Sequence, residues 1–209
     1  MARVIVGCEC SGRVREAFRK RGHDAWSCDL KPAEDNSPFH IQDDILSVLR
    51  TVKWDIGVFH PVCRYLANSG VKHLYIGGRK ENGVYMPRWE DMRKAAEFFN
   101  ALDKNERIPV RITENPIPHA HAVKLIGKYT QTTQPYHHGD KQMKTTCLWI
   151  RGTDKRVKPT NYVGPVPKDP KERKKWQDVW RCPPGPEREA ERSRTSPGIA
   201  DALATTFGC

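Results

Sequence analysis

Short apolar runs that alternate with amphipathic segments constrain the fold of this chain more than any other feature. The run "ARVIVG" (residues 2–7) reads as a buried strand, and "GRVREAFRKRG" (12–22) places its apolar residues on one helical face. A second strand-like run, "DAWSCD" (24–29), precedes the helical pattern "DDILSVLR" (43–50). This alternation is typical of a mainly parallel sheet with helices on both faces, so the sequence predicts an α/β fold.

The same alternation continues through the rest of the chain. We expect further strands over residues 54–60, 110–116, 130–138 (at an edge) and 145–150, and helices over 88–104, 121–127 and 196–208. Between two of these elements, residues 69–87 are polar and lack periodicity. Long loops inside compact domains often carry function, so this segment is predicted to be a mobile loop near the site.

Composition divides the chain into unequal parts. At 209 residues it has room for one substantial core, which residues 1–150 account for. Residues 151–190 hold seven of the sixteen prolines, with eleven Lys or Arg against six Asp or Glu. They predict a small, basic, loop-rich appendage. Residues 191–209 predict a helix that returns to the core formed by residues 1–150.

The charge and the cysteines point to a class of partner and a compartment. A formal net charge of +11 attracts polyanions, of which DNA is the first candidate, although a solvated basic surface is the alternative. No apolar run approaches the roughly 20 residues of a membrane span, and no secretory signal is visible. Seven cysteines, an odd number, fit free thiols in a reducing compartment, so we expect a cytoplasmic protein without a membrane partner.

The basic run "KDPKERKKW" (168–176) has two interpretations. It is either a solvated helical face or a contact with nucleic acid. Trp176 and Trp180 follow the same alternatives, since they could stack on bases or anchor the appendage to the core.

Chemically useful residues stand where the predicted strands end. In parallel sheets, ligands bind beyond the carboxyl ends of the strands. The segments at those ends are "GCECSG", Asp29, "HPVC" and "ENP", so Cys63 and Glu114 are expected at one rim. A thiolate and a carboxylic acid together suit attack on an electron-poor ring such as cytosine, because the acid can protonate the ring nitrogen while sulfur adds to carbon.

These motifs resemble those of a known family. "HPVC" followed about fifty residues later by "TENP" resembles the Pro-Cys and Glu-Asn motifs of the cytosine-5 DNA methyltransferases. "QMKTTCLWI" is similar to their Gln-x-Arg-x-Arg motif, and "DDI" to their Asp-Ile cofactor motif. "CECSG", "HPVCRYL" and "RSRTSPGIA" are most similar to short phage- or prophage-type members, over residues 1–150 and 192–208. The resemblance implies a Rossmann-like class I methyltransferase fold that binds S-adenosyl-L-methionine.

The resemblance also implies a reaction. Cys63 would add to carbon-6 of cytosine, while Glu114 engages ring nitrogen-3 and the exocyclic amine. Asn115 would shape that site, and Pro61 would orient the loop. The expected function is methylation of carbon-5 in DNA, on a base brought out of the stack.

The resemblance also implies which residues bind the cofactor and the substrate. Asp29 would accept from the ribose hydroxyls, Leu30 would lie against the adenine, and Asp44 would accept from its amino group. The implied cofactor site comprises Gly7, Cys8, Glu9, Cys10, Ser11, Gly12, Asp29, Leu30, Asp44 and Ile45. The implied substrate-binding residues are Arg64, Gln142, Lys144 and Thr146.

Departures from the family pattern keep two alternatives open. The usual Pro-Pro-Cys-Gln is Pro-Val-Cys-Arg here, and Thr146 stands at the last arginine of the third motif. The reduced recognition region favours the same chemistry on a free pyrimidine nucleotide such as dCMP, and the altered motifs would suit a catalytically silent DNA-binding module. No metal is expected, because the cysteines and histidines lack ordered metal-ligand spacing. The residues considered for zinc are Cys8, Cys10, Cys28, His119, His121, His137 and His138. The four histidines are predicted instead to lie in loops or on the surface near the substrate rim.

Overall fold

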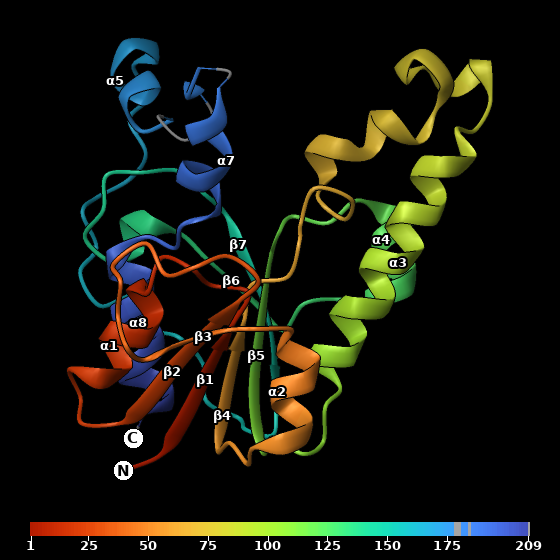
Figure 1. Ribbon diagram of the computed structural model, residues 1–209. Coiled ribbons are helices and arrows are strands. Elements are labelled where there is room, and N and C mark those ends of the chain that lie inside the picture. The colour runs from red at the N-terminus through yellow and green to blue at the C-terminus, as the bar shows by residue number, and fades with distance from the viewer. Residues whose placement is uncertain (178–180, 184, 209) are drawn as a thin grey trace.

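The computed structural model describes residues 1–177, 181–183 and 185–208 (Figure 1). The chain forms a seven-stranded sheet with the order β3-β2-β1-β4-β5-β7-β6. Strand β7 runs antiparallel to both of its neighbours, and the other pairings are parallel. The predicted α/β fold with a mainly parallel sheet is therefore confirmed. The strands are β1 (Arg3–Gly7), β2 (Asp24–Asp29), β3 (His40–Gln42), β4 (Ile56–Phe59), β5 (Val110–Pro116), β6 (Gln131–Thr133) and β7 (Thr146–Arg151).

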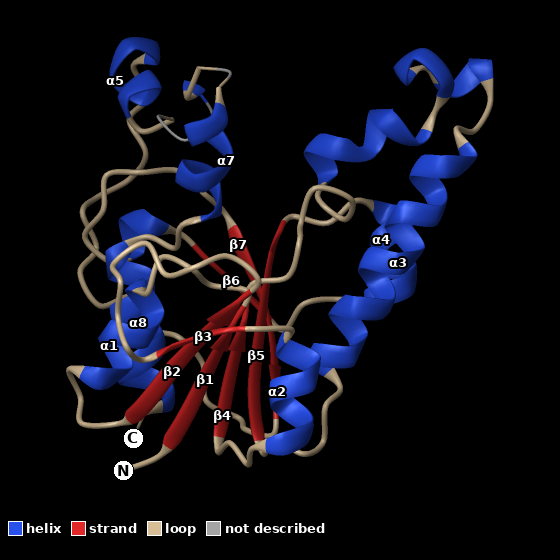
Figure 2. Cartoon of the chain, viewed as in Figure 1, coloured by secondary structure: helices blue, strands red, loops and turns tan. Residues whose placement is uncertain are grey.

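Helices cover both faces of the sheet, as expected (Figure 2). One face carries α1 (Arg13–Arg19) and α8 (Pro197–Phe207), and the other carries α2 (Ile45–Thr51), α3 (Met86–Asp103) and α4 (Ala120–Ile126). Two further helices, α5 (Pro170–Lys175) and α7 (Pro186–Ser193), extend beyond the carboxyl ends of the strands (Figure 1). None of the helices in the described part of the chain is both long and apolar enough to cross a membrane.

Strand β1 shows why the sheet holds two cores. Val4 and Val6 pack on the α1 and α8 side, together with Phe18. Ile5 points the other way and packs with Leu49 of α2. Alternate side chains of a strand face opposite sides of a sheet, so a continuous apolar run is buried on both faces. Full burial of each such side chain contributes about 2 kcal/mol.

The closing helix follows its sequence signals. The Ser196 side chain accepts a hydrogen bond from the Ile199 backbone N–H, and Pro197 occupies the first turn. Helix α8 packs along α1, with Arg21 paired to Asp201 at 2.8 Å. The two termini of the chain consequently lie close together (Figure 1).

Two segments differ from the sequence-based expectation. Residues 69–87 were predicted to be a mobile loop without regular structure. Instead, most of this segment belongs to the 3₁₀ helices Asn68–Leu74, Ile76–Gly78 and Lys80–Asn82. Leu74 is buried and its carbonyl accepts from Trp89 Nε1 at 3.0 Å, which ties this segment to α3. Strand β3 was not predicted, because three residues are too few to show a period.

The predicted edge strand over residues 130–138 is also shorter than expected. It consists of β6 alone, followed by the 3₁₀ turn Pro135–His137. Pro135 has no backbone N–H to donate to a ladder, which explains why the strand ends before it.

Trp176 joins the appendage to the core. It is 8 % exposed, its carbonyl accepts from Met143 N at 2.7 Å, and its ring lies 5.9 Å from that of Tyr136. Trp176 thus follows the anchoring alternative, whereas Trp180 lies outside the described residues.

Candidate active site

Strand β4 and the turn that follows it deliver Cys63 to the carboxyl rim of the sheet. The backbone N–H of His60 donates to the Gly7 carbonyl at 3.0 Å, which continues the sheet one residue past β4. The buried Pro61 then leads into a turn in which the N–H groups of Leu66 and Ala67 both donate to the Cys63 carbonyl, at 3.0 and 2.8 Å. Cys63 therefore sits above the middle of the sheet.

Strand β5 brings Glu114 to the same level. In the β4–β5 register Phe59 pairs with Thr113, so Glu114 is the next residue along, beside His60. The predicted juxtaposition is reflected in the electrostatics: burial raises the pKa of the Cys63 thiol and the Glu114 carboxylate raises it further, while Lys144 and Arg192 act against them. Burial and Glu114 thus favour the protonated thiol, while Lys144 and Arg192 favour the thiolate.

His60 and Glu114 form a buried pair. His60 Nδ1 lies 3.6 Å from Glu114 Oε1, and the two side chains are only 8 % and 13 % exposed. Burial would lower the pKa of His60, but Glu114 more than reverses this and the pKa is raised. Burial would likewise raise the pKa of Glu114, yet His60 and Lys144 hold it below its usual value. The pair is thus held as imidazolium and carboxylate.

Lys144 is the cation that faces this pair and Cys63. Its Nζ donates to the Arg194 carbonyl at 2.8 Å. Burial lowers the pKa of Lys144, and the proximity of Glu114 and Cys63 opposes that effect. Lys144 therefore links the rim to the segment that precedes α8.

The other predicted substrate-binding residues lie in different surroundings. Gln142 lines a surface hollow of about 360 Å³ together with Arg13 and Arg194. Thr146 is only 3 % exposed, and its hydroxyl donates to the Lys144 carbonyl at 3.3 Å, so it supports the loop from within. Arg64 is exposed and stacks on Tyr65, with its guanidinium 4.7 Å from the ring centroid.

Asn115 is fully buried next to Glu114. Its Nδ2 donates to the Pro116 carbonyl at 2.6 Å, while its Oδ1 has no hydrogen-bond partner among the described residues. Buried polar atoms are normally paired, so this orphaned acceptor is a group left over for a ligand.

His119 has a structural role that the sequence analysis did not foresee. It lies in the loop before α4, one of the two places expected, but it is buried there, at 2 % exposed. Its Nδ1 accepts from Ala122 N at 3.0 Å, so its Nε2 carries the proton and donates to the Tyr65 carbonyl at 3.1 Å. The His119 backbone N–H also donates to the Leu66 carbonyl. His119 thereby fastens the Cys63 turn to the segment after β5.

His138 also lies in a loop and is buried there. It is 5 % exposed and bonded to the hydroxyls of Thr133 and Thr160, at 2.7 and 3.0 Å. Among the described residues, no group of three His, Cys, Asp or Glu side chains could hold a metal ion.

The predicted cofactor turn uses its acidic residue structurally. Glu9 is 6 % exposed and accepts from the backbone N–H groups of Val14 and Arg15, at 2.8 and 3.3 Å, and from Ser11 Oγ at 3.2 Å. Helix α1 begins after Gly12, which has no side chain to cap it. Glu9 therefore supplies the cap, because the first N–H groups of a helix need an acceptor.

The rest of this turn is held by backbone contacts and one weak thiol contact. Cys8 has a φ of 60°, and its N–H donates to the Cys28 carbonyl at 2.7 Å. Cys10 Sγ lies 3.6 Å from Glu34 Oε1. The left-handed backbone at a non-glycine residue indicates that the turn is constrained.

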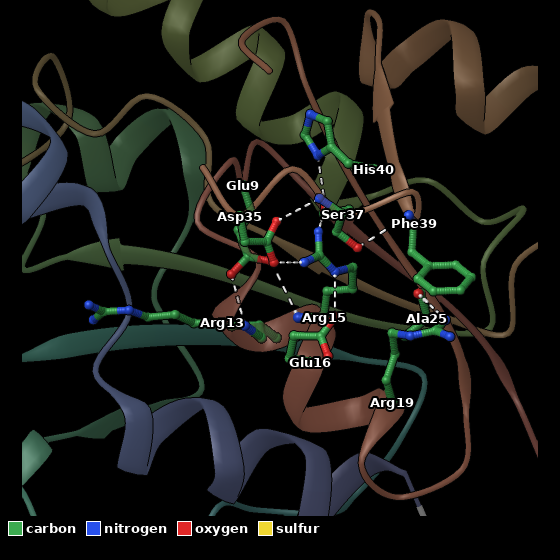
Figure 3. Close-up of polar contacts among 12 residues, drawn as sticks. Glu9, Arg13, Arg15, Glu16, Arg19, Ala25, Asp35, Ser37, Phe39 and His40 are labelled. Atoms are coloured by element: carbon green, nitrogen blue, oxygen red, sulfur yellow. Dashed lines mark hydrogen bonds and ion pairs between the residues drawn. The ribbon is translucent and has the colours of Figure 1, made fainter. Parts of the chain in front are cut away.

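Arg15 anchors the loop after β2 (Figure 3). Its side chain is fully buried, and it donates to Ser27 Oγ at 2.8 Å and pairs with Glu16 at 3.0 Å. It also pairs with Asp35 of that loop. The loop is therefore clamped to α1 beside the predicted cofactor turn.

The remaining predicted cofactor residues divide into surface and core. Asp29 Oδ1 accepts from Lys31 N at 2.9 Å, Asp44 Oδ1 accepts from Leu46 N at 3.1 Å at the start of α2, and Leu30 is 74 % exposed. Ile45 is buried in the core, and a Cβ on Gly7 would lie 2.8 Å from Ile45 Cγ1. Two carboxylates around an exposed apolar side chain fit a nucleoside, which presents hydroxyl and amino donors beside a flat ring.

Comparison with known proteins gives structural matches. No protein-family model and no curated protein matches the sequence. A methyltransferase of Entamoeba histolytica superposes with a TM-score of 0.51 at 12 % identity, over 79 % of this chain and 57 % of the other. A candidate DNA modification methyltransferase encoded in an E. coli prophage superposes with a TM-score of 0.43 at 14 % identity, over 72 % of this chain and 46 % of the other. This chain spans roughly half the length of those two structures. The first of them, with the strand order, shows that the chain has a Rossmann-like methyltransferase fold.

Proposed function

We propose that this protein is an S-adenosyl-L-methionine-dependent cytosine-5 methyltransferase that acts on DNA through a covalent Cys63 adduct. The observation that carries the proposal is the meeting of Cys63 and Glu114 at one rim, where the carboxylate acts on the pKa of the thiol and Lys144 opposes it. The methyltransferase fold supports a transfer reaction at that rim.

The cofactor would lie at the carboxyl ends of β1 and β2. Asp29 and Asp44 would accept from its hydroxyl and amino groups, and the exposed Leu30 would cover its ring. When bound there, S-adenosyl-L-methionine would supply an electrophilic methyl group.

The protein side chains would perform the rest of the reaction. The Cys63 thiol loses its proton to solvent, aided by the charge of Lys144, and sulfur bonds to carbon-6 of the base. During this addition ring nitrogen-3 accepts a proton through Glu114. Carbon-5 thereby gains electron density and can attack the methyl group. After carbon-5 has been methylated it gives its proton to solvent, the sulfur–carbon bond breaks with its electron pair on sulfur, and nitrogen-3 releases its proton, which restores the ring.

Cations around the rim support DNA as the substrate. Arg64, the residue after Cys63, lies on the ring of Tyr65 with its guanidinium 4.7 Å from the ring centroid. Arg88 of α3 lies on the same ring at 4.2 Å. Helix α5 adds the basic sequence "PKERKK" beyond the same ends of the strands (Figure 1). Phosphate contacts from such residues supply most of the sequence-independent affinity for DNA.

A second candidate substrate is a free nucleotide such as dCMP. The hollow of about 360 Å³ near Gln142 is lined by Arg13, Lys141 and Arg194. The Arg194 carbonyl is also the acceptor for Lys144, so the hollow adjoins the rim. These cations could hold a single phosphate while the base reaches Cys63.

One experiment separates the two substrates and tests the nucleophile. The protein is incubated with methyl-labelled cofactor and duplex DNA, single-stranded DNA or dCMP. We expect label in cytosine of DNA, and a loss of at least about a thousandfold in Cys63→Ala. Cys182→Ala, which changes another partly exposed cysteine, should retain the wild-type rate.

Two outcomes would change the assignment. Label in dCMP but not in DNA would replace the first substrate with the second. Transfer by Cys63→Ala at the wild-type rate would refute the nucleophile.

A further inference from the structure

The His60–Glu114 pair raises a chemical question for the proposed reaction. Sulfur addition leaves negative charge on the pyrimidine ring unless nitrogen-3 is protonated. Glu114 is the acid that faces the base, yet its surroundings lower its pKa, so it is ionised near neutral pH. A carboxylate cannot supply the proton by itself.

His60 is the neighbouring group that can hold that proton. It lies after β4, in the middle of the rim, between Glu9 after β1 and Glu114 on β5. Its side chain is 8 % exposed, and neither ring nitrogen has a hydrogen-bond partner among the described residues. Buried polar atoms are hydrogen-bonded in the great majority of cases, so an imidazole that meets Glu114 at 3.6 Å but makes no hydrogen bond within the described part of the chain needs an explanation beyond packing.

We propose that His60 and Glu114 form a dyad that holds one proton for the pyrimidine base. As sulfur bonds to carbon-6, the proton of His60 Nδ1 passes to Glu114 and from Glu114 to ring nitrogen-3, which leaves His60 neutral and Glu114 ionised again. When the sulfur–carbon bond breaks, nitrogen-3 returns the proton to the dyad. This inference rests on the proposed function, and His60 acts as a positioning residue through Glu114.

The charges around His60 favour Glu114 as its partner. Glu9 also favours the imidazolium, and Lys144 opposes it. The Glu9 carboxylate, however, already accepts from two backbone N–H groups of α1 and from Ser11. Glu114 is the carboxylate within 3.6 Å of Nδ1.

The first test measures the proton on His60 in the protein without substrate or cofactor. Histidine is labelled with ¹⁵N, His60 is assigned from the loss of its signal in His60→Asn, and the imidazole is titrated by NMR. We expect His60 to keep its proton above the ordinary histidine pKa of about 6.5. In Glu114→Gln the main group that opposes the effect of burial on His60 is lost. The apparent pKa of His60 should therefore fall by at least about one unit.

A matched variant controls for a general charge effect. Asp140→Asn removes a carboxylate that acts on another buried histidine, His138, and should leave the His60 titration unchanged. A His60 titration that is the same in the wild type and in Glu114→Gln would overturn the dyad.

The second test follows the adduct with DNA that contains 5-fluoro-2′-deoxycytidine. In His60→Asn the proton can rest only on Glu114, so the alkaline limb of the pH–rate profile for adduct formation should move to lower pH by at least about one unit. The rate at neutral pH should then be roughly tenfold lower. An equal loss of rate at every pH would indicate a purely structural role and would overturn the proposal.

The two tests fail separately. If the wild-type protein forms no adduct with any nucleic acid, the proposed function fails while the NMR titration still decides whether the dyad exists. If the adduct forms but the His60 titration is the same in Glu114→Gln as in the wild type, the dyad fails while the proposed function stands.

Discussion

The two halves of the carboxyl rim treat their buried polar groups in opposite ways. On the β1–β2 side Glu9 accepts three hydrogen bonds, and Arg15 and Ser27 are bonded to each other. On the β4–β5 side both nitrogens of His60, the oxygen of Asn115 and the hydroxyl of Thr113 have no hydrogen-bond partner among the described residues. The first half is hydrogen-bonded, while the second keeps buried polar atoms that make no hydrogen bond with those residues.

The difference shows where stability and reactivity reside. Unsatisfied buried polar groups cost stability, and proteins retain them mainly at functional sites. We therefore expect substitutions on the β1–β2 side to weaken folding and substitutions on the β4–β5 side to alter chemistry.

The largest effect on stability is expected at Arg15. Arg15→Ala leaves a cavity where a fully buried side chain stood and removes the bond to Ser27, so the free energy of unfolding should fall by about 3 kcal/mol. Urea denaturation measures the change. The surface variant Arg50→Ala, on α2, should cost far less. Equal losses in both variants would mean that the Arg15 network does not hold this half together.

A smaller and more specific effect separates two buried hydroxyls. Ser27→Ala removes an acceptor of Arg15 and should cost about 1.5 kcal/mol. Thr113→Val replaces an unpaired hydroxyl with a methyl group of similar shape and should change stability by less than about 0.5 kcal/mol. Thermal and urea unfolding of the two variants compare the halves directly. If Thr113→Val lowered the free energy of unfolding as much as Ser27→Ala does, the two halves of the rim would not differ in this way.

The smallest effect concerns the reactivity of Cys63. Burial raises the pKa of the Cys63 thiol most. Glu114 raises it further, and Lys144 lowers it. Glu114→Gln should therefore move the pH midpoint of Cys63 alkylation down, and Lys144→Met should move it up. Mass spectrometry after iodoacetamide treatment follows Cys63, with Cys182 of the same molecule as the internal reference. Shifts in the same direction would contradict the opposed roles of the two charges.

Much of the fold could be predicted from the sequence, because strands and helices of this type repeat with clear periods. Helix α3 and strand β7 lie where the apolar pattern places them, and Ser196 caps α8 as expected. The short β3 and the 3₁₀ helices after Asn68 were not predicted, since they depend on pairing with distant residues and have no period of their own.

The site was predictable only in part. Cys63 follows β4 and Glu114 lies on β5, the strand beside it, so their meeting follows from the order of the sheet. The roles of Glu9 and His119 were not foreseen, because a carboxylate that caps a helix and an imidazole that fastens a loop look the same in sequence as ligand-binding residues.

By itself the sequence determined the alternation of strands and helices, the basic charge and the residues at each strand end, because those depend on local periodicity and composition. Tertiary structure decided which of those residues are already bonded. Whether a buried side chain is satisfied depends on partners far away in the chain, as with Glu114 beside His60 and Lys144 on the Arg194 carbonyl. Those long-range contacts separate the structural half of the rim from the half left for chemistry.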